Sequence, residues 1–236
     1  IEPETARLIR NVRWENSKGD ITDFKFERFS SFADDHVYCI KVKVTPINYS
    51  GKIKIMSGID KRVKTGGQKV TSVLNEVAED NMSYVHTLMG KKYGFETGIT
   101  TVTDINADVK WSGESVDGLI YNTAELDAKE GNEYTIEKRV YVVSSREGDV
   151  STPNPQKLSY DEYFNIHMKA YGEAFGMVDM KIGGDEKADV GIRFANYHSI
   201  ISASHTDSIH SVAAKGLTGE RYNDFVWWDC EVYQLP

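Results

Sequence analysis

The chain has 236 residues, and its 28 lysines and arginines against 36 aspartates and glutamates give a formal net charge of −8. This acidic balance argues against a general nucleic-acid binder, which needs a concentrated basic face. No apolar run approaches the roughly 20 residues of a membrane span, so no membrane partner is expected. Cys39 and Cys230 lie far apart in the sequence, and we expect two free thiols in a cytoplasmic protein rather than a disulfide.

The length allows one large domain or two modest ones with a substantial core. The sequence opens with IEPETARLIR, without a methionine or a charged-then-apolar leader, and it closes on QLP. Neither end resembles a natural terminus, so we expect the chain to be part of a longer polypeptide.

Residues 1–150 are expected to be β structure, because short runs in this region alternate polar and apolar residues with a period of two. Glycine, asparagine, aspartate and proline between the runs are typical of turns. The expected strands cover residues 23–29, 37–44, 52–57, 98–102, 107–111 and 134–143. Several short strands with few helical stretches predict an antiparallel β-sandwich.

Residues 151–181 are expected to form a linker loop followed by a helix. Two prolines mark residues 151–158 as the loop, and Ser159 with Glu162 has the spacing of a capping box. The expected buried stripe of the helix consists of apolar residues three or four positions apart, at 160, 164, 168, 171, 175 and 178.

A second helix is expected after the break at Gly183 and Gly184, with Asp185 as its N-cap. One face of this helix carries four apolar or aromatic residues, at 190, 194, 197 and 201. Further along, HTDSIH at 205–210 contains two imidazoles and a carboxylate, but no additional ligand type supports a metal site there, and none is expected.

The last stretch, KGLTGERYNDFVWWDCEVYQLP at 215–236, groups large aromatic rings with two acids, Asp229 and Glu231. In an extended segment these two acids point to the same face. Aromatic rings beside carboxylates suit a sugar, because the rings stack on its C–H faces and the carboxylates accept its hydroxyl hydrogens. The alternative is that the aromatics belong to the core and the acids are solvated.

This stretch resembles the KGLTG…GH.FWDTE…LP segment of glycoside hydrolase family sixty-five, which contains mainly inverting disaccharide phosphorylases and some acid trehalases. Asn223 and Asp224 replace the usual Gly-His, and Trp227 and Cys230 replace the usual Phe and Thr. The resemblance extends upstream to RFSSFADDHVYCIKVKVTPINYSGKIKIMSGID at 28–60 and to GIRFANYHSI at 191–200.

The resemblance implies a fold that is mostly β with α: an antiparallel sandwich, a linker helix and the first part of an (α/α)6 barrel. The implied domains are 1–150 for an incomplete sandwich, 151–181 for the linker and 182–236 for the beginning of the catalytic barrel. The Gly-rich opening segment of the family's sandwich domain is expected to precede residue 1.

By the same resemblance, the glucosyl subsite includes Trp228 as a wall and Asp229 as a hydroxyl acceptor, together with Glu231. Arg193 and Phe194 are further candidates for the same pocket, and the alternative for Arg193 is an ordinary surface or interdomain ion pair. The family's general acid and phosphate site are expected beyond residue 236, so this chain holds no catalytic residue. Asp161-Glu162-Tyr163 resembles the general-acid motif, but we interpret Glu162 as a capping residue.

The implied function is phosphorolysis of an α-glucosyl disaccharide to β-glucose 1-phosphate, with inorganic phosphate as co-substrate and no cofactor. The implied assembly is a homodimer. Two alternatives stay open: an acid trehalase-type hydrolase of the same family, and a non-catalytic carbohydrate-binding module. The sequence does not identify the disaccharide linkage or the acceptor.

Overall fold

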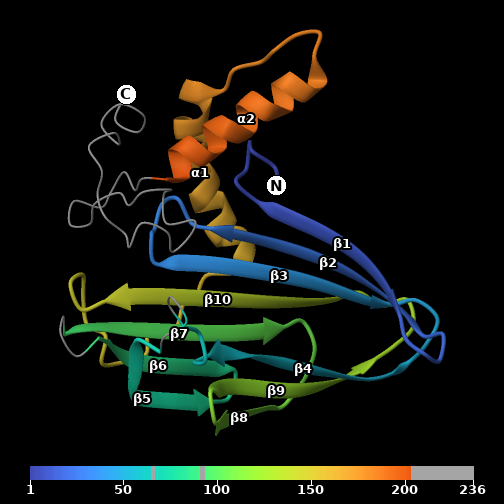
Figure 1. Ribbon diagram of the computed structural model, residues 1–236. Helices are drawn as coiled ribbons and strands as arrows, with labels where there is room; N and C mark the ends of the chain where they lie inside the picture. Colours follow the sequence, from blue (N-terminus) through green and yellow to red (C-terminus); the bar gives the residue numbers. More distant parts are fainter. Residues whose placement is uncertain (65–66, 68, 91–93, 203–236) are drawn as a thin grey trace.

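The computed structural model describes residues 1–64, 67, 69–90 and 94–202. Within these residues, ten strands are followed by two helices (Figure 1). The strands are β1 (Leu8–Glu15), β2 (Ile21–Ser30), β3 (Val37–Pro46), β4 (Gly51–Asp60), β5 (Thr71–Glu79), β6 (Met82–Met89), β7 (Phe95–Ile105), β8 (Trp111–Val116), β9 (Leu119–Ala128) and β10 (Tyr134–Ser144). The helices are α1 (Tyr160–Val178) and α2 (Glu186–Ile201).

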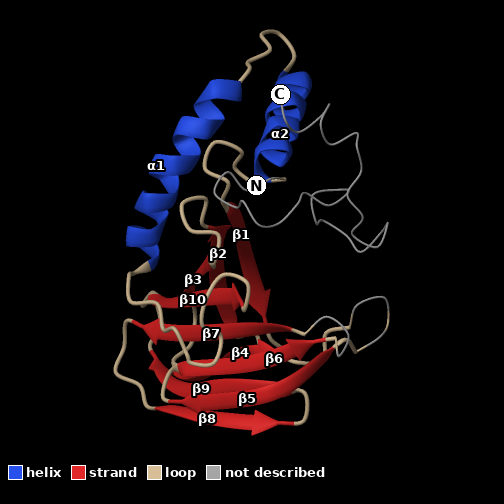
Figure 2. Ribbon diagram, turned by 90° about the vertical axis from the view of Figure 1, so that its left-hand side faces the viewer, coloured by secondary structure: helices blue, strands red, loops and turns tan. Residues whose placement is uncertain are grey.

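The strands form two sheets that pack face to face, and the helices lie at one end of them (Figure 2). The large sheet has the order β1-β2-β3-β10-β7-β6-β5, and the small sheet has the order β4-β9-β8. All neighbouring strands are antiparallel. The antiparallel sandwich predicted from the alternating runs is therefore confirmed.

The prediction of a strand at 107–111 was wrong, because only Trp111 belongs to a strand. Ala107, Val109 and Trp111 pack on the cluster of Ile55, Leu126 and Ala128 between the two sheets. Their alternation therefore reflects a loop in which every second side chain is partly buried. Five strands were not predicted: β1, β5, β6, β8 and β9.

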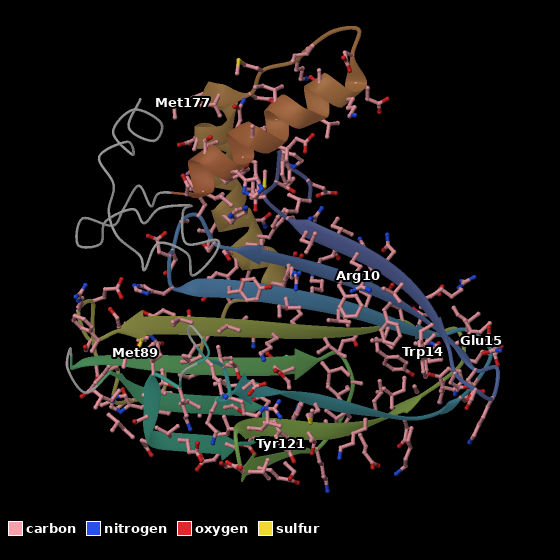
Figure 3. All side chains as sticks on the ribbon, in the orientation of Figure 1. Arg10, Trp14, Glu15, Met89, Tyr121 and Met177 are labelled. Atoms are coloured by element: carbon pink, nitrogen blue, oxygen red, sulfur yellow. The ribbon has the colours of Figure 1, made fainter. Side chains whose placement is uncertain are left out.

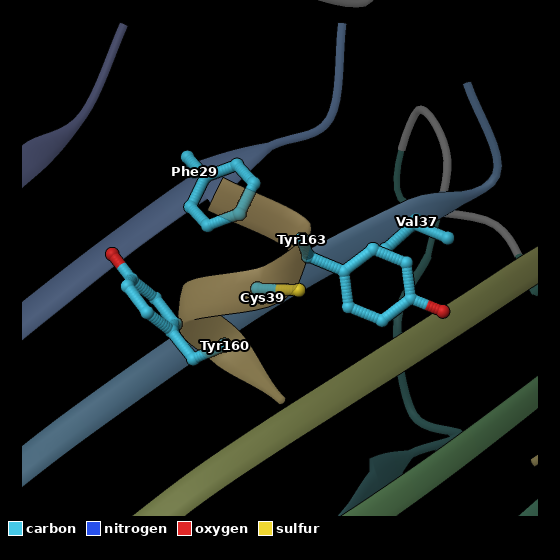
Figure 4. Packing of buried hydrophobic residues seen from close by; sticks show 5 residues of the cluster. All are labelled: Phe29, Val37, Cys39, Tyr160 and Tyr163. Carbon is cyan, nitrogen blue, oxygen red and sulfur yellow. The ribbon is translucent and has the colours of Figure 1, made fainter. Parts of the chain in front are cut away.

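Helix α1 begins where the capping box was predicted. The Ser159 hydroxyl accepts a hydrogen bond from the Glu162 N–H at 3.3 Å, and the Glu162 carboxylate accepts one from the Ser159 N–H at 2.7 Å. The first turn of α1 packs on β2 and β3 through one buried cluster, which is shown in Figure 4. This cluster consists of Phe29, Val37, Cys39, Tyr160 and Tyr163.

The buried stripe of α1 differs from the predicted one. Tyr160, Tyr171 and Phe175 are buried as expected, but Tyr163 and His167 are also buried, whereas Val178 is 38 % exposed. The two polar-tipped side chains are accommodated because each has a hydrogen-bond partner. The Tyr163 hydroxyl donates to the Gln156 side chain at 2.5 Å, and both ring nitrogens of His167 are bonded.

Helix α2 begins at its predicted N-cap, where the Asp185 carboxylate accepts from the Ala188 N–H at 3.0 Å. None of its residues is buried by the part of the chain that the structure describes, and Val190 is 58 % exposed. In the same residues, neither helix is both long enough and apolar enough to cross a bilayer.

At Gly58, the backbone of β4 lies very close to the backbone of β9. A Cβ placed on it would lie 2.1 Å from the Ile120 carbonyl oxygen and 2.5 Å from the Tyr121 Cβ. Backbone cannot yield as a flexible side chain does, so we expect Gly58→Ala to lower the free energy of unfolding by roughly 1–3 kcal/mol. Urea titration measures the difference.

The matched control for this substitution is Gly172→Ala on an exposed turn of α1, where nothing lies within 4 Å of the added Cβ. That variant should gain up to about 1 kcal/mol, because alanine favours the helix more than glycine. Equal unfolding midpoints for Gly58→Ala and the wild type would contradict the close approach.

The His167 ring is fully buried and has a defined tautomer. Its Nδ1 accepts from the Phe32 N–H at 3.1 Å, so the proton lies on Nε2, which donates to the Thr5 carbonyl at 2.9 Å. Burial lowers the pKa of His167 below its ordinary 6.5, and the Thr5 carbonyl opposes the shift only in part. Below pH 6.5 the unfolded chain therefore binds more protons than the folded one, and stability falls as the pH falls.

We expect the free energy of unfolding to decline between pH 7 and pH 5 more steeply in the wild type than in His167→Asn. Asparagine keeps a donor and an acceptor but does not titrate, so the variant should be less stable at neutral pH and less sensitive to acid. Urea titrations across this range measure both slopes. Identical slopes would show that His167 does not contribute to the acid sensitivity.

Candidate functional site

The predicted sugar-binding residues fall into two groups. Trp228, Asp229 and Glu231 lie outside the described residues, as does the HTDSIH segment at 205–210. Arg193 and Phe194 lie on α2, in the part that the structure describes. The geometry below therefore concerns the Arg193 side of the candidate pocket.

Arg193 joins three segments that are distant in the sequence. Its Nε and Nη2 donate to the two carboxylate oxygens of Asp179, at 2.7 and 3.3 Å, just after the end of α1. Its Nη1 donates to the Glu4 carboxylate in the N-terminal segment at 2.7 Å. The ion pair that the sequence left open as the alternative for Arg193 is thus present.

Not all N–H groups of the Arg193 guanidinium are used by these two carboxylates. A guanidinium carries five N–H groups, and the hydrogen bonds to Asp179 and Glu4 use three of them. The remaining two, one on each terminal nitrogen, have no partner among the described residues. The side chain is 16 % exposed and lies over the Phe175 ring at 5.7 Å, so its position is restricted on several sides.

The N-terminal segment that carries Glu4 is itself fixed against α1. The Tyr171 hydroxyl donates to the Pro3 carbonyl at 2.5 Å, and His167 donates to the Thr5 carbonyl. Arg7, which ends this segment, pairs with the Glu27 carboxylate on β2 at 3.2 Å. Consequently Glu4 is a pre-positioned partner for Arg193.

Phe194 belongs to a group of rings on α2. It contacts His198 edge-on at 4.4 Å between ring centroids and Tyr197 at 6.2 Å, and it is 43 % exposed. No contact joins Phe194 to the guanidinium of its neighbour Arg193 in the described chain, since adjacent helix residues point to different faces. An exposed aromatic face of this kind is suited to stacking on a sugar ring.

Two other side chains behave as the sequence predicted. Two hydrogen bonds from Ser159 lower the pKa of Glu162, which keeps it ionised and suits a cap better than a general acid. Burial raises the pKa of the Cys39 thiol to about 12, so this thiol is unreactive. Among the described residues, no group of three or more histidine, cysteine and acidic side chains is placed to hold a metal.

Sequence reasoning missed Glu4 and Asp179, the two carboxylates that hold Arg193. Glu4 lies 189 residues away from Arg193, so no local pattern connects them. The only available signal was the pairing of His167 and Tyr171 one helical turn apart, which marks the face of α1 that receives the N-terminal segment.

Comparison with known proteins assigns this architecture to a family. Residues 4–173 match the glycosyl hydrolase family 65 N-terminal domain, and residues 193–236 match the central catalytic domain of the same family. Among solved structures, a putative kojibiose phosphorylase from the human microbiome shares the fold, with a TM-score of 0.84 and 18% identity. The alignment covers 99% of this chain and 32% of that one.

Two curated relatives illustrate the sequence similarity. The 3-O-alpha-D-glucosyl-L-rhamnose phosphorylase of Lachnoclostridium phytofermentans is 40% identical over 99% of this chain and 32% of its own length. The kojibiose phosphorylase of Halothermothrix orenii is 31% identical over 100% of this chain and 33% of its own length. The chain therefore spans about a third of these relatives, and it belongs to glycosyl hydrolase family 65.

Proposed function

We propose that this chain is part of an inverting phosphorylase that cleaves an α-glucosyl disaccharide with inorganic phosphate. The observation that supports the proposal most directly is the 40% identity, over nearly the whole chain, to a relative named as a phosphorylase. Other relatives with similar coverage are named kojibiose, trehalose and nigerose phosphorylases. A disaccharide and phosphate are therefore the proposed substrates.

In the proposed reaction, a phosphate oxygen attacks the anomeric carbon from the face opposite the leaving group. The glycosidic C–O bond breaks while a glutamic acid beyond residue 236 gives its proton to the leaving oxygen. The products are β-glucose 1-phosphate and the free acceptor sugar. Phosphate replaces the water of an inverting hydrolase, so one carboxyl group is sufficient.

The proposed acceptor is L-rhamnose, released from a 3-O-α-glucosyl linkage. We choose this acceptor because the chain is 40% identical to the relative named for that disaccharide but 31% identical to a kojibiose phosphorylase.

For the domains, we propose that residues 1–150 form the sandwich, 151–181 the linker and 182–236 the opening of an (α/α)6 catalytic barrel. The match of residues 193–236 to the catalytic domain supports the last assignment. A homodimer and a cytoplasmic location are proposed on the family resemblance alone.

We propose that the glucosyl subsite contains Trp228, Asp229 and Glu231, with Arg193 and Phe194 beside them. For Arg193, the supporting observation is that its two remaining N–H groups are held in place by the carboxylates of Asp179 and Glu4. Donors fixed in this way lose little entropy when a sugar hydroxyl binds.

The reaction is tested with the complete polypeptide and a panel of disaccharides that includes 3-O-α-glucosyl-L-rhamnose, kojibiose, nigerose, maltose and trehalose. We expect glucose 1-phosphate to form only when inorganic phosphate is present, and fastest from the rhamnoside. Glucose release that is indifferent to phosphate would instead support a trehalase-type hydrolase. Binding without turnover of any sugar would support the carbohydrate-binding module.

The role of Arg193 is tested by comparing Arg193→Gln with Glu4→Gln in the complete polypeptide. Glu4→Gln weakens the ion pair but keeps the guanidinium, so it should mainly lower stability. Arg193→Gln also removes the two donors, and a lost charged hydrogen bond of about 2 kcal/mol corresponds to a roughly 30-fold lower kcat/KM. Steady-state kinetics and thermal unfolding should be measured on both variants.

If both substitutions lower kcat/KM equally, Arg193 has only the structural role of the ion pair. Arg13→Gln is a suitable control for the loss of a charge, because Arg13 pairs with Asp23 on the exposed face of β1 and β2. We expect the activity of this control to equal that of the wild type.

A further inference from the structure

The N-terminal segment, residues 2–7, lies next to α1 and α2 (Figure 2), and side chains of all three gather there (Figure 3). The segment folds back on itself through a β-bridge between Glu2 and Arg7. Within it, Ala6 has a φ of 46°, a left-handed conformation that costs free energy at a residue other than glycine. The form of the segment therefore depends on the contacts that hold it.

Two hydrogen bonds from α1 hold this segment on either side of Glu4. The His167 Nε2 donates to the Thr5 carbonyl at 2.9 Å, and the Tyr171 hydroxyl donates to the Pro3 carbonyl at 2.5 Å. Because Pro3 and Thr5 are the neighbours of Glu4, these two bonds fix the backbone that carries its carboxylate. Loss of either bond allows that carboxylate to move.

The surroundings of the His167 ring are aromatic. Phe29 of β2 lies 4.9 Å away between ring centroids, and Phe164 and Tyr171 of α1 lie 5.9 and 5.4 Å away. Both ring nitrogens are bonded to backbone groups of other segments. A buried site lined by rings disfavours the charged form of an imidazole, which is why burial lowers the pKa of His167.

The charged side chains on the elements around this ring have other partners. In the loop after β2, the Asp34 carboxylate accepts from the His36 N–H at 3.0 Å. The other pairs are Glu4 with Arg193, Arg7 with Glu2 and Glu27, and Lys41 with Glu137 and Asp161. In the described chain none of these carboxylates contacts the imidazole, so a proton on the ring is not offset by a negative charge.

A protonated imidazole cannot keep both of its hydrogen bonds. The Nδ1 of His167 accepts from the Phe32 N–H at 3.1 Å, and a proton added at Nδ1 would point at that N–H. The charged ring is most stable in water, and a ring that turns outward also gives up the Thr5 carbonyl. The first turn of α1 is held separately by its cluster with β2 and β3, so the change is confined to the segment and the adjoining loop.

We propose that His167 is a positioning residue for Arg193 and makes the candidate sugar site sensitive to pH. The neutral ring holds the N-terminal segment, the segment holds Glu4, and Glu4 holds one side of the Arg193 guanidinium. When His167 takes up a proton, the segment is released, and Arg193 retains only one of its two carboxylates, Asp179. This inference rests on the proposed place of Arg193 in the sugar-binding site and adds the regulation of that site.

The expected effect is a loss of activity in acid that precedes unfolding. Because burial places the pKa of His167 below 6.5, the release occurs below that pH. It differs from the substitution Glu4→Gln, whose amide oxygen still accepts from Arg193, whereas a released segment offers no acceptor.

The pH dependence of kcat/KM in the complete polypeptide tests the proposal, with 3-O-α-glucosyl-L-rhamnose and phosphate as substrates. His167→Asn keeps a donor and an acceptor but does not titrate. The ratio of its kcat/KM to that of the wild type should increase on the order of tenfold from pH 7 to pH 5, because only the wild type releases its segment. Taking this ratio at each pH cancels the titration of phosphate and of the catalytic groups.

The matched control is His36→Asn. His36 also bonds a backbone carbonyl, that of Val142 at 2.8 Å, but no bond joins it to the N-terminal segment in the described chain. The ratio of its kcat/KM to that of the wild type should stay constant from pH 7 to pH 5. A constant ratio for His167→Asn as well would overturn the proposal.

Hydrogen exchange detects the release without an activity assay. After correction for the intrinsic rate at each pH, the amides of residues 2–7 and Phe32 in the wild type should exchange on the order of tenfold faster at pH 5 than at pH 7, while those of β3 keep their protection. Tyr171→Phe removes the second bond from α1, so release should occur at a higher pH in that variant. Equal protection of the segment at both pH values would overturn the proposal.

The two measurements separate this inference from the function on which it rests. Release of the segment with a constant activity ratio would overturn the positioning role of His167. If the complete polypeptide phosphorolyses no disaccharide at any pH, the proposed function is wrong, and the exchange measurement still decides whether His167 controls the segment.

Discussion

The arrangement of the helices and the large sheet depends on two hydrogen bonds made by the neutral imidazole of His167. The ring is fully buried on α1. It accepts a hydrogen bond from the Phe32 N–H after β2 and donates one to the Thr5 carbonyl near the N-terminus, so it connects these two segments. In a charged ring Nδ1 would also carry a proton, and that proton would point at the Phe32 N–H, so the junction requires the neutral form. The packing of α1 is therefore tied to a single protonation state.

A series of polar contacts extends from this junction in both directions along α1. At the first turn, the Lys41 ammonium bonds the Asp161 carboxylate at 2.7 Å and the Glu137 carboxylate at 3.3 Å. Beyond His167, the Tyr171 hydroxyl donates to the Pro3 carbonyl, and after the end of the helix Arg193 joins Glu4 to Asp179. Because such pairs are directional and costly to break when partly buried, they fix the orientation of α1 and the position of α2 more than they add stability.

The sequence predicted those features that depend on neighbours in the chain. The capping box at Ser159, the N-cap at Asp185 and six alternating runs are local patterns, and only the run at 107–111 was misassigned. Strand β6 was missed because Ser83, Tyr84, Val85 and His86 are all buried, so no alternation marks it. Contacts between distant residues, such as Glu4 with Arg193, leave no local signal, and the sugar-binding residues were identified only through family resemblance.

Strand β2 shows why the two faces of the large sheet must be considered together. Phe24 and Phe26 point to the inner face and Phe29 to the outer face, so large apolar side chains occupy both sides. Along residues 23–28 the strand alternates polar and apolar residues, which is typical of an antiparallel strand with one apolar face. Phe29 breaks the alternation, and its ring packs edge-on against Tyr160 in the first turn of α1. The sandwich therefore determines the residue pattern along most of β2, and the helix determines it only at the end of the strand.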